Sequence, residues 1–171
     1  SKDEANEQAR AVTREIAEEG TIMLKNNGAL PLTGTGLKVS VFGKNSVNLV
    51  YGGSGSGGGD TTFEKETIFD SLTAAGLEFN PELKAFYEDD SRSGDGRSDN
   101  PSDLDSGETV AIETGETPAA DYPDDAALKL GEYDDAAIVV ISRVGGEGFD
   151  LPMDEAYGAR HYLSLDSNER D

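Results

Sequence analysis

The sequence contains no cysteine and a single histidine, His161. The lack of cysteine excludes disulfides, thiolate zinc sites and cysteine nucleophiles, and one histidine excludes a metal site built on several imidazoles. Positive charge is also scarce, because 14 Lys and Arg stand against 35 Asp and Glu, a net charge of −21. Since this charge repels phosphates and anionic lipid headgroups, we expect neither nucleic acid nor a membrane as a partner.

Long apolar runs are missing as well. No run approaches the roughly 18 residues of a membrane-spanning helix, and the first ten residues, SKDEANEQAR, lack the apolar centre of a signal peptide. We therefore expect a soluble protein. At 171 residues the chain is long enough for one globular domain and short for two, so residues 1–171 are interpreted as one domain.

Helix and strand patterns alternate along the chain, which is typical of α/β folds with a mostly parallel sheet. Apolar residues first recur at helical spacing between Glu4 and Leu24. The elements expected after this helix are an inner strand at 37–42, a helix at 63–75, a short strand at 78–79, helices at 81–87 and 124–130, and a strand at 137–141. Asp166 and Glu169 have the spacing of a capping box, which predicts a further helix.

Residues 88–125 are rich in Asp, Ser, Gly and Glu and poor in large apolar side chains. Such a stretch buries too little surface to offset its ordering entropy, so we predict a mobile acidic insertion within the domain. Asp103, Asp105 and Gly107 resemble a calcium loop only in part, because the glycine is misplaced and Thr114 stands where the closing Glu of an EF-hand belongs. The sequence therefore predicts no metal site.

The segment 137–150, AIVVISRVGGEGFD, is the strongest candidate for a functional site. Its continuous apolar run is typical of a strand covered on both faces of a parallel sheet, and such sheets bind ligands beyond the carboxyl ends of their strands. The flanking glycines allow a sharp turn and a close approach to a ligand. Glu147, which lies between them, is therefore the candidate acid.

A second glycine-rich loop begins at Gly43 and runs to Asp60. Gly53, Gly55 and Gly58 fit the G-x-G-x-x-G pattern of dinucleotide sites, but about ten residues separate them from the preceding strand, whereas the fingerprint follows its strand at once. A flexible loop is favoured over a nucleotide cradle. A nucleotide-binding α/β domain that uses this loop remains one alternative function, and a non-catalytic carbohydrate-binding module is another.

Three segments occur in order: EEGTIMLKNNGALPL, KVSVFGKNSVNLVYGGSGSG and VVISRVGGEGFDLP. Together they resemble the α/β sandwich domain of family 3 glycoside hydrolases, notably β-glucosidases. The resemblance covers most of residues 15–152 except the acidic insertion, and continues into LSLDSNERD. It implies a three-layer α/β sandwich with a mostly parallel sheet, incomplete in this chain, and no cofactor. An incomplete sheet predicts an open apolar edge and self-association.

The resemblance implies part of a retaining β-glucosidase, which uses a carboxylate nucleophile and a carboxylate acid/base. In the family the nucleophilic Asp belongs to a (β/α)8 barrel, which is absent from this chain, and the acid/base maps onto Glu147. The family's other active-site loop resembles residues 51–57, where Ser54 is the first candidate for sugar contact and Ser56 the second, beside Gly53. The substrate would be a β-glucoside or an oligosaccharide.

The resemblance also implies roles in the site for three further residues. Arg143 would orient the acid loop, Asp150 would hydrogen-bond its backbone, and Phe149 would line the site for the leaving group. The resemblance points to a bacterial-type enzyme but leaves the compartment open between cytoplasmic and secreted.

Overall fold

The computed structural model describes residues 1–52, 65–97, 114–145 and 163–171. Their contacts divide the chain into two compact units, residues 1–34 and residues 35–171. No helix in these described stretches combines the length and the apolar character needed to cross a membrane.

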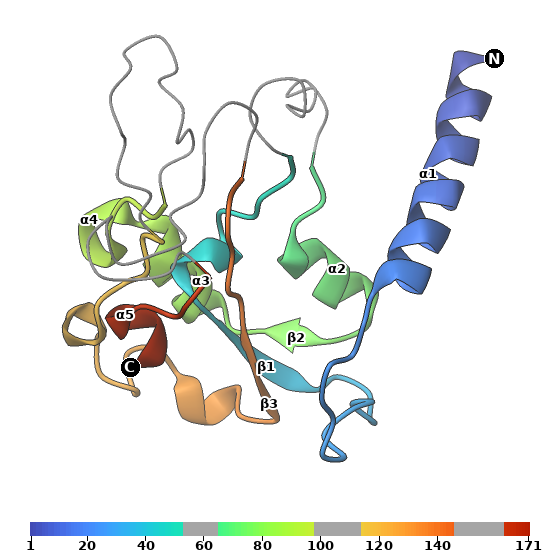
Figure 1. Ribbon diagram of the computed structural model, residues 1–171. Helices are drawn as coiled ribbons and strands as arrows, with labels where there is room; N and C mark the ends of the chain where they lie inside the picture. Colours follow the sequence, from blue (N-terminus) through green and yellow to red (C-terminus); the bar gives the residue numbers. More distant parts are fainter. Residues whose placement is uncertain (53–64, 98–113, 146–162) are drawn as a thin grey trace, which may run out of the picture. The chain divides into compact units, whose positions relative to one another are not determined.

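The first unit contains one long helix, α1 (Lys2–Gly20), which is drawn in blue in Figure 1. Ser1 and Glu4 form a capping box at its start. The helix ends where Thr21 adopts an extended conformation, so it is shorter than the 4–24 range expected from apolar spacing. No residue of α1 is buried, and the apolar stripe that includes Val12 and Ile16 is exposed.

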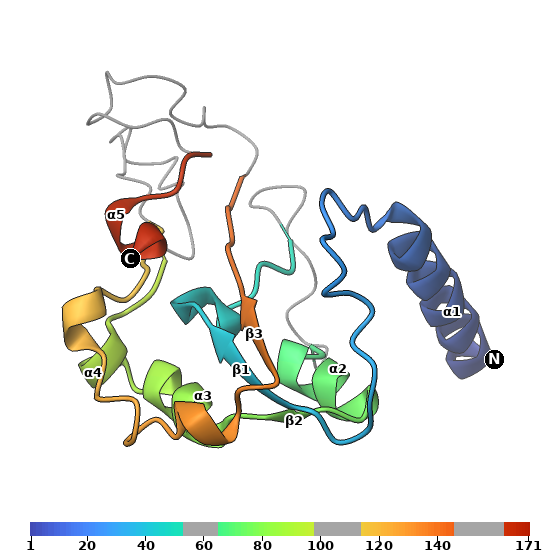
Figure 2. The ribbon, with the colours of Figure 1, turned by 90° about the horizontal axis from the view of Figure 1, so that it is seen from below.

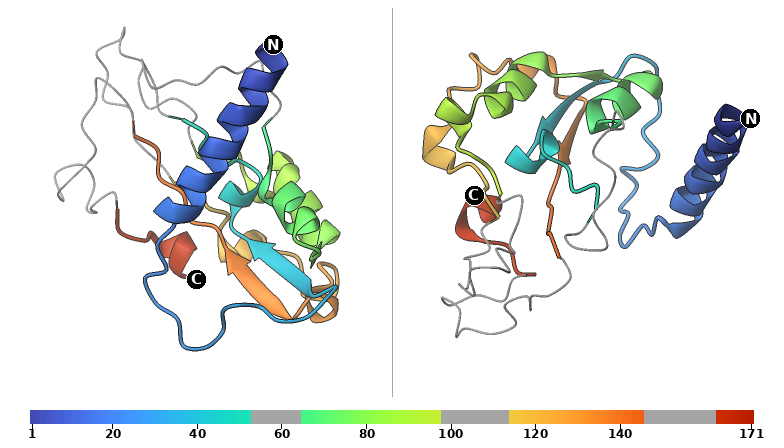
Figure 3. Two further views of the ribbon diagram at one scale, coloured as in Figure 1. Left: turned by 90° about the vertical axis from the view of Figure 1, so that its right-hand side faces the viewer. Right: turned by 90° about the horizontal axis from the view of Figure 1, so that it is seen from above.

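The second unit is built on a parallel sheet of three described strands: β1 (Lys38–Phe42), β2 (Glu78–Phe79) and β3 (Ala136–Val139). Their order is β2-β1-β3, and β1 pairs with β3 from Val39↔Ala136 to Phe42↔Val139. The prediction that residues 37–42 form an inner strand is confirmed. Figures 2 and 3 show β1 beside β3.

Helices cover both faces of β1. Val39 and Val41 share an apolar cluster with Phe69 of α2 (Ile68–Ala74). Phe42 instead packs against the buried cluster that contains Phe86 of α3 (Pro81–Glu88). Because successive side chains of a strand point to opposite faces, α2 and α3 lie on opposite sides of the sheet. The resulting helix–sheet–helix arrangement is the expected α/β sandwich.

The strand expected at 137–141 differs from its prediction. β3 spans Ala136–Val139, and it is covered on one face only. Ala136 and Ile138 pack against the cluster of Val41 and Phe69, whereas Val139 is 62% exposed and Ile141 is 50% exposed. The expectation of cover on both faces is wrong, because the described residues pack against only the face that carries Ala136 and Ile138. Among the described strands β3 is at one end of the order, and the open apolar edge and self-association stay predictions.

The helix expected at 124–130 is replaced by turns and a short 3₁₀ helix, η4 (Leu130–Glu132). Leu128 and Leu130 donate backbone hydrogen bonds to Asp124 and Asp125, so one helical turn begins. Lys129 then adopts the left-handed conformation, with φ of 52°, which a regular right-handed helix does not accommodate.

The two ends of the acidic stretch 88–125 are packed into the domain. Helix α4 (Asp90–Ser93) and the 3₁₀ helix η3 (Ala119–Asp121) lie there, and Ser93, Thr114 and Thr117 are buried. The hydroxyl of Thr117 donates to the carbonyl of Ser93 at 2.8 Å. Hydrogen bonds of this kind satisfy polar side chains that composition alone assigns to solvent. Residues 98–113 lie outside the described residues.

Two valines on the paired strands give a matched test of this architecture. Val41 is 1% exposed and Val139 is 62% exposed. We expect Val41→Ala to lower the free energy of unfolding by about 2–3 kcal/mol, because it removes buried methyl groups and leaves a cavity. Val139→Ala should change it by less than about 0.5 kcal/mol. Urea unfolding of both variants measures the difference, and equal losses would contradict the described sheet.

Candidate functional site

The chain order places two loop segments at the same edge of the sheet. β1 leads into residues 43–67, and β3 leads into residues 140–166. From β1 the chain passes through α2 to β2 on one side, and it later reaches β3 on the other side of β1. In open parallel sheets, ligand crevices form where the strand order reverses in this way, beyond the carboxyl ends of the strands. A ligand site is therefore expected beyond the ends of β1 and β3.

Most of the sequence-predicted site residues lie outside the described residues. Residues 53–64 include Gly53, Ser54 and Ser56, and residues 146–162 include Glu147, Phe149 and Asp150. Their roles remain predictions. The structure describes the chain on both sides of each segment, and it describes Arg143.

Gly43 brings the ends of β1 and β3 into close contact. It has φ of 99°, and a Cβ atom at this position would lie 2.5 Å from the carbonyl oxygen of Val140. Only glycine fits such a conformation and such an approach. The amide of Val140 donates to the carbonyl of Phe42 at 2.9 Å, and the amide of Gly43 donates to the hydroxyl of Tyr87 at 2.9 Å. The two candidate segments thus begin side by side.

The two ends of the glycine-rich segment lie close together. The hydroxyl of Tyr51 donates to the carbonyl of Glu66 at 2.9 Å, and the Nζ atom of Lys65 lies 4.9 Å from the centre of the Tyr51 ring. These contacts join residue 51, before the segment, to residues 65 and 66, after it.

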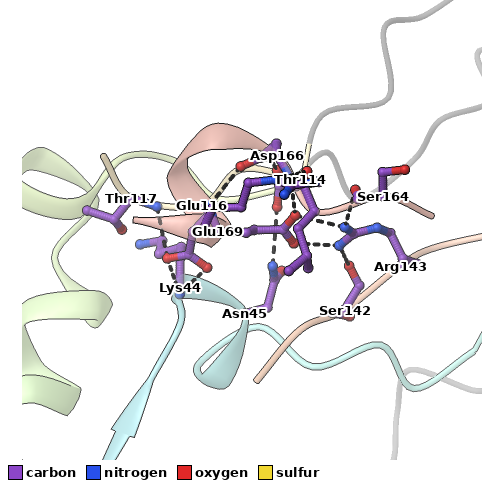
Figure 4. A network of polar contacts seen from close by, with 12 residues as sticks. Lys44, Asn45, Thr114, Glu116, Thr117, Ser142, Arg143, Ser164, Asp166 and Glu169 are labelled. Atoms are coloured by element: carbon purple, nitrogen blue, oxygen red, sulfur yellow. Dashed lines mark hydrogen bonds and ion pairs between the residues drawn. The ribbon is translucent and has the colours of Figure 1, made fainter. Parts of the chain in front are cut away.

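Arg143 lies at the centre of a polar network beyond the end of β3, shown in Figure 4. Its guanidinium donates to both carboxylate oxygens of Glu169, at 2.5 and 2.7 Å. It also donates to the carbonyl oxygens of Ser142, at 2.9 Å, and Ser164, at 3.0 Å. The structure shows that Arg143 contacts Ser142, Ser164 and Glu169. Its role in orienting the loop that carries Glu147 stays a prediction.

Helix α5 (Ser167–Arg170) connects Arg143 to the rest of the network. Asp166 and Glu169 form its predicted capping box, with both backbone bonds at 2.9 Å. Asp166 also accepts a hydrogen bond from the hydroxyl of Thr114. Asn168 donates to the carbonyl of Glu116 at 3.1 Å. The helix therefore links the end of β3 to the segment that begins at Thr114.

Glu116 carries the network on to the end of β1. Its carboxylate accepts hydrogen bonds from the amides of Lys44, at 3.0 and 3.1 Å, and Thr117, at 3.0 Å. Burial raises the pKa of the Glu116 carboxyl, the two amide bonds oppose the rise, and the nearby Glu169 and Asp166 add to it.

Lys44 is itself buried. Its ammonium group donates to the carbonyl of Tyr87 at 2.5 Å, to Asp90 at 2.8 Å and to the hydroxyl of Ser93 at 2.9 Å. Sequence reasoning missed both Lys44 and Glu116, because no motif marks them and the contacts that place them in the network join residues 43 and 72 positions apart.

The described residues contain no group of three or more His, Cys, Asp or Glu side chains placed to hold a metal ion. A groove of about 460 Å³ lies beside the network, and Phe42, Tyr122, Val139 and Glu116 are among its lining residues. The described side chains thus form a scaffold around the ends of β1 and β3, and the candidate reacting groups belong to the segments between residues 52 and 65 and between 145 and 163.

The raised pKa of Glu116 predicts a pH effect on stability. The ordinary pKa of a Glu carboxyl is 4.5, and the native protein holds the Glu116 proton more tightly than the unfolded chain does. The protonated carboxyl therefore makes its full contribution to the free energy of unfolding below pH 4.5. That contribution is lost as the pH rises through the native pKa. The free energy of unfolding of the wild type minus that of Glu116→Gln should therefore fall from about pH 4.5 upward and then level off. Urea unfolding over a pH series measures it. Glu132→Gln, at an exposed position, is the matched control, and a rising difference for Glu116→Gln would contradict the assignment.

Comparison with known proteins identifies the family. The model of the glycosyl hydrolase family 3 C-terminal domain matches residues 21–169. A β-glucosidase from Ruminococcus albus is 29% identical over 155 residues, which is 91% of this chain and 15% of that protein. β-Glucosidase 1 from Aspergillus aculeatus is 43% identical over 44 residues, 26% of this chain and 5% of that protein.

A solved structure agrees with these matches. The structure of β-glucosidase 3B from Thermotoga neapolitana in complex with α-D-glucose superposes with a TM-score of 0.62 at 29% identity, over 84% of this chain and 19% of that one. This chain thus spans 15% of the Ruminococcus albus relative and 19% of the solved one. On the family match, which covers most of its length, the chain belongs to the glycosyl hydrolase family 3 C-terminal domain family.

Proposed function

We propose that this chain is the part of a retaining β-glucosidase that supplies the general acid/base carboxylate, Glu147. The observation that carries the proposal is the close contact of the ends of β1 and β3, because the two segments with the candidate residues follow directly from these neighbouring strands. The family match and the β-glucosidase relatives support a glycoside as substrate.

In a retaining mechanism Glu147 would act twice. It first donates a proton to the departing glycosidic oxygen, while a nucleophilic carboxylate attacks the sugar. It then accepts a proton from the water that hydrolyses the glycosyl-enzyme. The nucleophilic Asp would come from a (β/α)8 barrel outside this chain. Closure of the barrel over the segment 146–162 would supply the burial and the neighbouring charge that raise the pKa of such an acid.

The remaining site residues have supporting roles in this proposal. Ser54, with Ser56 as the second choice, would bind the sugar hydroxyls beside Gly53, and Phe149 would contact the leaving group. Asp150 would hydrogen-bond the backbone of the acid segment. The Thermotoga neapolitana relative was solved in complex with α-D-glucose, which supports a sugar as the ligand of this proposed site.

This chain alone should not hydrolyse an aryl β-glucoside. The proposal places the nucleophile on another domain, and an acid without a nucleophile cannot form the glycosyl-enzyme. Release of nitrophenol from nitrophenyl β-glucoside measures activity. Hydrolysis by this chain that disappears in Glu147→Gln would contradict the division of the site between two domains.

In the complete enzyme, Glu147→Gln should lower kcat/KM by about 10²–10⁴-fold for a glucoside with a poor leaving group. The loss should be much smaller for dinitrophenyl glucoside, whose leaving group departs without protonation. Azide should restore turnover of the dinitrophenyl substrate in Glu147→Ala, because it replaces the activated water. Glu88→Gln, which removes an exposed carboxylate on α3, is the control. Equal losses for both substrates would show that Glu147 is not the acid.

A further inference from the structure

The contacts of Arg143 join the chain on the two sides of residues 146–162. Arg143 donates to the carbonyl of Ser142, before the segment, and to the carbonyl of Ser164 and the carboxylate of Glu169, after it. A single guanidinium thus connects residues 142–143 with residues 164–169. Figure 4 shows these groups converging on the Arg143 side chain.

The ion pair between Arg143 and Glu169 is enclosed by protein. The Glu169 side chain is 2% exposed and that of Arg143 is 15% exposed, whereas the pair of Lys84 and Glu88 on α3 is 27% and 51% exposed. Enclosed pairs are screened little by solvent and salt. Two parallel hydrogen bonds between a guanidinium and a carboxylate fix both the distance between the groups and their relative orientation. The Arg143–Glu169 pair is therefore suited to hold a backbone segment in one place.

Glu169 is held in turn by the rest of the domain. Its backbone amide donates to Asp166, whose other carboxylate oxygen accepts from Thr114. The preceding residue, Asn168, donates to the backbone carbonyl of Glu116. The carboxylate of Glu116 in turn accepts from the amide of Lys44 at the end of β1. Arg143 is thus anchored to the same turn that brings β1 against β3.

We propose that Glu169 is a positioning residue for the acid/base Glu147. By holding Arg143, Glu169 fixes the course of the chain where it leaves β3, four residues before Glu147. This inference rests on the proposed function of Glu147. A general acid must lie within hydrogen-bond reach of the glycosidic oxygen, and a displacement of about 1 Å can cost as much as 10²-fold in rate.

Glu169→Gln separates this role from the capping role of the same side chain. Gln keeps one oxygen that can accept from the amide of Asp166, and Gln is a normal partner in a capping box. Its amide nitrogen cannot accept from Arg143, so the paired contact and the charge are lost. The matched control is Glu88→Gln, the same substitution in the exposed pair with Lys84.

The experiment compares kcat/KM of the complete enzyme for an alkyl glucoside and for dinitrophenyl glucoside. In Glu169→Gln we expect kcat/KM for the alkyl glucoside, which needs the acid, to fall about tenfold or more. For dinitrophenyl glucoside the fold-loss in kcat/KM should be at most about one third as large. Glu88→Gln should leave both values unchanged. If Glu169 had only a structural role, the substitution would reduce the fraction of folded enzyme. The value of kcat/KM would then fall by the same factor for both substrates. A common factor, or no change, overturns the inference.

Arg143→Lys and Glu147→Gln complete the set of variants. If Glu169→Gln does not fold, as judged by circular dichroism, Arg143→Lys is measured in its place, because Lys keeps the charge but not the paired donors. A loss of kcat/KM that is larger for the alkyl glucoside than for dinitrophenyl glucoside supports the inference. An unchanged ratio of the two kcat/KM values overturns it. Glu147→Gln is measured in parallel. If it too leaves the ratio unchanged, the proposed function itself fails, whereas a selective effect of Glu147→Gln alone rejects only the role of Glu169.

Discussion

The parallel pairing of β1 with β3 is the constraint on which the rest of the structure depends. Four residue pairs, from Val39↔Ala136 to Phe42↔Val139, set the register, and the absent side chain of Gly43 lets the carbonyl of Val140 approach beyond the last pair. The paired residues lie 97 positions apart in sequence, from 42 to 139 at the last pair, so two distant segments start from adjacent points. The apolar cluster of Val39, Val41 and Phe69 stabilises this pairing from one face.

Beyond the strands, polar contacts replace apolar packing. Lys44 is bonded to Glu116, Glu116 to Asn168, and Arg143 to Glu169, the neighbour of Asn168 in α5. These contacts join the end of β1, the segment after Thr114, the end of β3 and α5. Buried charges are costly unless they are paired or hydrogen-bonded. Arg143 pairs with Glu169 and Lys44 with Asp90, and the Glu116 carboxylate accepts from two backbone amides. Such a network stabilises one arrangement of the chain ends, which is what a site assembled from several segments requires.

The sequence predicted the elements whose signals are local. The inner strand at 37–42 followed from its apolar residues, and α5 from the spacing of Asp166 and Glu169. The helix expected at 81–87 is α3, with Pro81 in its first turn. The family resemblance, carried by three ordered motifs, agreed with the family match over residues 21–169.

The sequence did not predict features that depend on distant partners. The burial of Lys44 is satisfied by Tyr87, Asp90 and Ser93, and composition cannot show such a partnership. Apolar spacing predicts a helix at 124–130, but the left-handed conformation of Lys129 ends it after one turn. The apolar residues of β3 do not show that only one face of the strand is packed, because that depends on which distant segments lie against it. The spacing of Glu169 predicts a helix cap, but its pairing with Arg143 links residues 26 positions apart.

The central claim is that Glu147 faces a cleft completed by another domain and reaches the bond that is cleaved. An experimental structure of the complete enzyme with a bound non-hydrolysable glucoside tests this most directly. The account predicts a Glu147 carboxylate oxygen about 2.6–3.2 Å from the atom that replaces the glycosidic oxygen, and about 5–5.5 Å from the nucleophilic carboxylate of the barrel. A Glu147 side chain packed against the core of this domain, with another acid at the glycosidic atom, would contradict it.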